Sequence, residues 1–89
     1  MAAWRYHLKI KDLIQTDEES DEYINKIKVT IAERLEAFSK TVQGYLRKEL
    51  RDLATNFRDI PEEGGNLDNF NYEMNQLYSL GDSAKIWIE

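Results

Sequence analysis

Apolar and polar residues alternate along the first segment of the chain. The apolar positions are Trp4, Tyr6, Leu8 and Ile10. The residues between them are basic or histidine. A period of two is typical of a β-strand with one buried face. The pattern therefore predicts a strand over about residues 3–11.

The long middle segment has apolar residues at intervals of three and four. This spacing runs from Ile24 to Phe57 and is typical of amphipathic helices. One helix over residues 20–58 would be about 58 Å long, whereas a compact domain of this size has a radius of gyration of roughly 12 Å. The run must therefore bend. Gly44 interrupts it, so we predict two helices that meet there.

The start of the first helix has a capping pattern. The Thr16 hydroxyl can accept from the backbone N–H of Glu19, whose side chain can reach back. Acidic residues continue to Glu22 and complement the positive end of the helix dipole. We therefore expect the helix to begin just after Thr16.

A loop and a third helix follow. Residues 59–65 contain the single proline and two of the four glycines, which indicates a loop. Asn66 can cap a helix. Gly81 stands where a left-handed final residue is wanted, so Gly81-Asp82-Ser83 is interpreted as a helix stop followed by a turn. Residues 85–89 then alternate as a second strand.

The element order is βαααβ, which predicts a small α+β single domain over residues 1–89. Its two-stranded sheet joins the N- and C-terminal strands and is covered on one face by the amphipathic helices. Ile86 and Ile88 should lie beneath the helices. Two open sheet edges invite pairing with a second copy, so we also predict a homodimer.

Composition narrows the functional classes. The chain has 89 residues, no cysteine and a net charge of −5. No apolar run approaches the ~20 residues of a membrane helix, and the N-terminal residues lack the basic-then-apolar pattern of a secretory leader. We expect a soluble, cytoplasmic protein without membrane contact, disulfide or thiolate metal site. The negative charge disfavours a general nucleic-acid binder.

The outer face of the predicted sheet is the first candidate surface. It gathers basic side chains around one indole: Arg5, His7, Lys9, Lys11 and Trp87. A functional interpretation is a platform on which Trp87 stacks a base while cations hold phosphates. The structural alternative is favoured: Trp87 meets Arg5 or His7 in a cation–π contact, and Glu89 pairs with a basic neighbour.

A second basic group lies along the middle segment. Lys40, Arg47, Arg51 and Arg58 would follow one line of a continuous helix. Such a stripe suits RNA or an acidic tail. The favoured alternative is a solvated face with two i,i+4 pairs, Glu36–Lys40 and Lys48–Asp52. A break at Gly44 should disperse the stripe further.

Tyrosines and asparagines on the third helix form the remaining candidate surface. Tyr72 and Tyr78 fall partly off the apolar face, among asparagines with poor helix propensity. Tyrosine suits protein recognition because it loses little rotamer entropy. A weakly stable helix held by packing is the plainer explanation.

No motif indicates catalysis, a cofactor or a metal. His7 is the single histidine, and an enzyme using His7 with Arg5 ranks last. The acidic residues 17–22 lack the glycine and spacing of a calcium loop. We predict a non-catalytic module that binds a partner protein. The alternative is a regulatory protein that binds RNA or DNA through the basic outer face of the strands.

Overall fold

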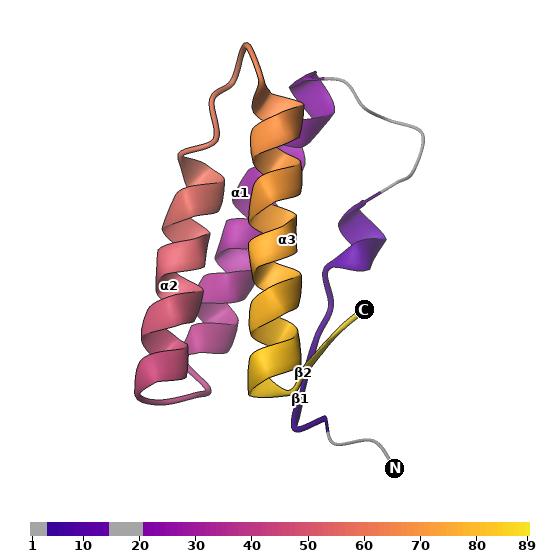
Figure 1. The fold of residues 1–89 in the computed structure, drawn as a ribbon. Coiled ribbons are helices and arrows are strands. Elements are labelled where there is room, and N and C mark those ends of the chain that lie inside the picture. The colour runs from indigo at the N-terminus through magenta and orange to yellow at the C-terminus, as the bar shows by residue number, and fades with distance from the viewer. Residues whose placement is uncertain (1–3, 15–20) are drawn as a thin grey trace.

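The computed structural model describes residues 4–14 and 21–89, apart from the side chain of Asp21. It confirms the βαααβ order, and Figure 1 shows three helices side by side with both strands next to α3. The radius of gyration is 12.9 Å. The elements are β1 (Tyr6–Leu8), a short 3-10 helix η1 (Lys11–Leu13), α1 (Asp21–Ser39), α2 (Tyr45–Arg58), α3 (Asn66–Ala84) and β2 (Ile86–Ile88).

The core lies between the three helices and continues under the sheet. The largest fully buried side chains are Phe57, Ile10, Ile31, Leu35, Leu50, Leu77, Ile86 and Asn66. Phe57 of α2 meets Phe70 of α3 edge to face, with ring centroids 5.9 Å apart. This geometry adds a favourable aromatic contact to the burial of apolar surface.

The break at Gly44 is confirmed. α1 ends at Ser39 and α2 begins at Tyr45, and Gly44 has a φ of 66°, a left-handed value that favours glycine. Arg47 holds the connection, because its Nε donates to the carbonyls of Ser39 at 3.1 Å and Val42 at 3.0 Å. The two helices therefore form a hairpin.

The two strands are parallel, and their register pairs Tyr6 with Ile86 and Leu8 with Ile88. The inner residues Ile86 and Ile88 are buried, whereas Trp87 between them is exposed. This alternation confirms the predicted inner and outer faces. A parallel pair needs a crossover connection, and here all three helices supply it.

The first strand is much shorter than the predicted span 3–11. β1 covers only Tyr6–Leu8 and pairs with the three residues of β2. Beyond it, the N–H groups of Ile10 and Lys11 both donate to the carbonyl of Glu89, at 2.5 and 2.8 Å. Two donors on one acceptor end the strand pattern, and the chain turns into η1.

The predicted helix stop at Gly81 is wrong. α3 continues through Asp82 and Ser83 to Ala84, and Lys85 takes the left-handed conformation with a φ of 64°. Gly81 is needed for a different reason. A Cβ atom there would lie 3.0 Å from the carbonyl oxygen of Ile86, because β2 folds back against this turn of α3.

The predicted caps have different outcomes. Asn66 is not the cap of α3: it is the first helical residue and is buried, and Gly65 occupies the N-cap position with a left-handed φ of 77°. The side-chain amide of Asn69 donates a hydrogen bond to the carbonyl of Gly65, at 2.9 Å. The capping pattern of Thr16 and Glu19 lies outside the described residues.

Arg34 of α1 covers part of the open edge of β1. Its guanidinium donates to the carbonyl of Lys9 at 2.7 Å and makes a bidentate pair with Asp12, at 2.7 and 3.2 Å. The hydrogen bond from Arg34 lowers the pKa of Asp12. This carbonyl, which directly follows β1, is therefore already used.

Candidate functional site

Two tryptophans form an exposed pair beside the sheet. Trp4 precedes β1 and Trp87 lies in β2, and their rings meet edge to face with centroids 5.2 Å apart. Trp4 is 37% exposed and Trp87 is 41% exposed. Contiguous exposed apolar surface is a candidate site for binding a partner.

The position of Trp4 corrects the alternation read from the sequence, which places it on the buried face. The N–H groups of Arg5 and Tyr6 both donate to the carbonyl of Lys85, at 2.8 and 3.1 Å. Two successive donors on one acceptor interrupt the alternation of a regular strand, as in a β-bulge. Trp4 therefore reaches the ring of Trp87. Sequence periodicity alone has no signal for this interruption.

A cavity of about 220 Å³ opens next to the tryptophan pair. It is lined by Trp4, Lys11, Tyr78, Asp82, Ile86, Trp87 and Ile88. The Nζ of Lys11 lies 5.8 Å from the ring centroid of Tyr78, within cation–π range. Partial burial raises the pKa of Tyr78. We call Trp4, Trp87, Tyr78 and Lys11 the aromatic patch.

The basic row of the first strand borders the aromatic patch. Arg5, His7 and Lys9 are all exposed. Glu89 enters this row, because its carboxylate lies 3.9 Å from His7 Nδ1 and accepts a hydrogen bond from Trp87 Nε1 at 3.2 Å. The neighbour that Glu89 approaches across the strands is thus His7. The neighbour that packs on Trp87 is Trp4, in place of the expected cation.

Tyr72 and Tyr78 do not share a surface. Six residues on a helix correspond to about 600°, which leaves the two side chains roughly 120° apart. Tyr78 belongs to the aromatic patch. Tyr72 is 60% exposed and lines a different cavity, of about 150 Å³, between α2 and α3. The tyrosine surface expected on the third helix is therefore divided between two sites.

The cavity beside Tyr72 is acidic. Glu49, Asp52 and Glu73 line it. The Oε1 atom of Glu73 is buried and has no hydrogen-bond partner among the described residues. Burial raises the pKa of Glu73, and a hydrogen bond with Asn56 opposes this rise. An ionised carboxylate in this position is a cost to the folded state.

Glu73→Gln should therefore stabilise the protein at pH 7. A carboxyl whose pKa is raised by folding destabilises the fold above that pKa, and the fold gains stability as the pH falls through it. The advantage of the variant should shrink toward pH 4. Urea unfolding at both pH values measures it, with the exposed Glu33→Gln as control. A Glu73→Gln protein less stable than the wild type at pH 7 would contradict this account.

The described part of the chain has no group of three His, Asp or Glu side chains placed to hold a metal ion. Within the same residues, no helix is long and apolar enough to cross a membrane. Comparison with protein-family models, curated proteins and solved structures found no match. The function is therefore inferred from the geometry of these surfaces.

Proposed function

We propose that this protein is a small interaction module that binds a segment of a partner protein at the aromatic patch. The observation that carries the proposal is the accessible pair of Trp4 and Trp87 beside a cavity. Tryptophan is enriched at the centres of protein interfaces, where a few large side chains contribute most of the binding energy. The proposed role is binding, without catalysis.

The surroundings of the patch indicate what kind of segment fits. Arg5, Lys9 and Lys11 supply exposed positive charge, and Ile86 and Ile88 contribute apolar cavity wall. Such a surface suits an extended peptide that carries large apolar side chains next to Asp or Glu. Opposite charges at the rim speed association and favour the correct partner.

A peptide-display library screened against the full chain tests this proposal. Enriched peptides should combine acidic and large apolar residues. Their binding can be followed directly, because Trp4 and Trp87 are the only tryptophans in the sequence, so a change in tryptophan emission reports contact at the patch. Failure to enrich any peptide, or binding without a change in emission, would overturn the proposal.

Trp87→Ala should lower the affinity for the selected peptides by about thirtyfold or more. This corresponds to a loss of at least roughly 2 kcal/mol of binding free energy, as expected when a central interface residue is truncated. Fluorescence polarisation of labelled peptides measures the loss. Tyr45→Ala is the matched control, because Tyr45 is 71% exposed at the start of α2 and does not line the patch. Equal affinity of Trp87→Ala and the wild type would assign the peptides to another surface.

Nucleic-acid binding is a second candidate, favoured by the exposed cations Arg5, Lys9 and Lys11 around two indoles. One feature weighs against it. The indole planes are inclined at 65°, which leaves no parallel stacking slot between them. Gel shifts with single-stranded RNA and DNA at 50–200 mM salt distinguish the candidates, because phosphate-driven binding weakens steeply across this range.

The predicted homodimer stays a proposal. It rests on the open edges of a two-stranded sheet, and light scattering tests it. The cytoplasmic location expected from composition also stays a prediction.

A further inference from the structure

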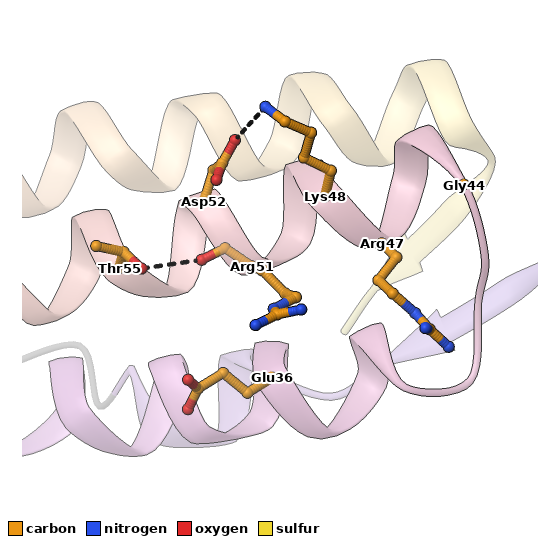
Figure 2. Close-up of a pocket in the computed structure, with 7 residues that line it drawn as sticks. All are labelled: Glu36, Gly44, Arg47, Lys48, Arg51, Asp52 and Thr55. Atoms are coloured by element: carbon orange, nitrogen blue, oxygen red, sulfur yellow. Dashed lines mark hydrogen bonds and ion pairs between the residues drawn. The ribbon is translucent and has the colours of Figure 1, made fainter.

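A second site lies at the hairpin of α1 and α2, away from the residues of the aromatic patch. A groove of about 280 Å³ is lined by Glu36, Ser39, Lys40, Arg47 and Arg51. In Figure 2, Arg47 and Arg51 extend from α2 toward α1, whereas Lys48 points the other way, to Asp52. Three cations from two chain segments therefore share one groove.

The chain reversal at Gly44 brings these cations together. The expectation that a break there disperses the basic stripe is wrong, because the break folds α2 back along α1 and places Lys40 beside Arg47 and Arg51. Arg58 leaves the group and pairs with Glu36. The expected Lys48–Asp52 pair is present at 3.3 Å. Glu36 is engaged by Arg58, in place of the expected Lys40.

The groove has more positive charge than its own acids neutralise. The acid that lines it, Glu36, is bound by Arg58. Within the described residues, Lys40, Arg47 and Arg51 have no carboxylate within ion-pair distance. This concentration of charge stands out in a chain whose net charge is −5. A bound anion would relieve the repulsion among the three cations.

The three cations are held differently, in a way that suits an oxyanion. Arg47 is fixed because its Nε donates to the carbonyls of Ser39 and Val42 and its Nη2 to that of Lys40, so its position is set before any ligand arrives. The guanidinium of Arg51 makes no hydrogen bond to the described part of the chain that would have to break. Guanidinium groups bind phosphate oxygens in bidentate fashion, with geometric specificity that lysine lacks.

The N-terminus of α2 adds to the positive electrostatic potential of the groove. Its first turn contains no acidic residue, and no side chain caps it. The uncapped N–H groups give this end a partial positive charge, and Gly44 lines the adjoining cavity. The carbonyls at the end of α1 and in the turn after it would oppose an anion, but the Arg47 guanidinium already binds those of Ser39, Lys40 and Val42.

We propose that the groove formed by Lys40, Arg47 and Arg51 binds a phosphate group. The chemical class is a phosphate monoester or a diphosphate, carried either by a small molecule or by a phosphorylated side chain of a protein. Arg47 would orient the group, Arg51 would close on it, and Lys40 would complete the charge balance. This site is independent of peptide binding at the aromatic patch.

Titration of the ¹⁵N-labelled chain with inorganic pyrophosphate, at ionic strength held constant with sodium chloride, tests the proposal. Amides from Lys40 to Arg51 should shift saturably, and tryptophan emission should not change. Arg51→Gln should weaken binding about tenfold or more, the effect of losing a charged hydrogen-bonding group. Lys26→Gln is the matched control, since it removes one exposed positive charge from α1 outside the groove.

The titration distinguishes a specific phosphate site from nonspecific binding of anions. Saturable shifts that Arg51→Gln weakens and Lys26→Gln preserves support the site, and comparison with a phosphoserine peptide shows which carrier binds tighter. Non-saturable shifts, or equal binding by Arg51→Gln and the wild type, overturn it. Arg51 is exposed, so the spectrum of the free variant will show that its fold is retained. Failure of this titration leaves the peptide-binding result unaffected.

Discussion

Replacing Phe57 with alanine should lower the free energy of unfolding by about 3–5 kcal/mol, the usual cost of truncating a buried phenylalanine. Phe57 is fully buried, and its ring meets Phe70 across the boundary of α2 and α3. Truncation removes the burial of the ring, leaves a cavity and abolishes the edge-to-face contact. A domain of this size has roughly 5–15 kcal/mol in total, so this single change should remove a large share of the stability.

Urea unfolding followed by circular dichroism measures this loss. Tyr45→Ala is the matched control, because it truncates an aromatic residue of the same helix that is 71% exposed, and surface changes of this kind usually stay within about 0.5 kcal/mol. A Phe57→Ala protein with the unfolding midpoint of Tyr45→Ala would show that α2 and α3 do not pack as described.

Gly81→Val should separate β2 from α3 and weaken peptide binding at the aromatic patch together with stability. A Cβ atom placed at Gly81 would lie 3.0 Å from the Ile86 carbonyl oxygen and 3.2 Å from Ile88 Cγ1. The two methyl groups of valine add to this overlap. Overpacking costs about 1–3 kcal/mol, and movement of β2 instead would expose Ile86 and Ile88, at about 1.5–3 kcal/mol each.

Tryptophan emission and urea unfolding detect the two effects separately. The rings of Trp4 and Trp87 are in contact, so displacement of β2 should shift the tryptophan emission of the folded variant. Ser79→Val is the control, because it places the same side chain at an exposed position of α3. If Gly81→Val kept the wild-type emission, stability and peptide affinity, the close approach of β2 to α3 would be refuted.

The helices and the inner face of the sheet could be predicted because each depends on local pattern. Apolar spacing indicated the three helices, and Gly44 marked the break through its conformational freedom. The alternation of Ile86, Trp87 and Ile88 correctly predicted which side of β2 is buried. These signals lie in residues that are close together in the sequence, so they can be recognised without knowledge of the tertiary structure.

The features that were mispredicted depend on contacts between distant segments. From the sequence, Gly81 is typical of a helix end, but in the structure it lies inside α3 because β2 packs closely against it. The left-handed residue at the end of the helix is Lys85. Trp4 leaves the buried face because of two hydrogen bonds to one carbonyl of Lys85. Neither event has a signature in the residues beside it.

The same limit applies to the candidate sites. The sequence identifies Arg5, His7, Lys9, Lys11 and Trp87 as outward-facing, but it cannot show that Trp4 and Tyr78 join them. It also cannot show that a chain reversal gathers Lys40 with two arginines, because helix spacing describes only one continuous helix. In both places the tertiary arrangement creates the cluster.

The parallel pairing of the two terminal strands makes the aromatic patch a product of completed folding. Tyr6 must find Ile86 near the opposite end of the sequence, and closing so long a loop carries an entropic cost that short-range helix contacts avoid. A chain that has formed only its helices lacks the joined tryptophans. A partner that recognises them would therefore select finished molecules, and its binding would in turn hold the two ends of the chain together.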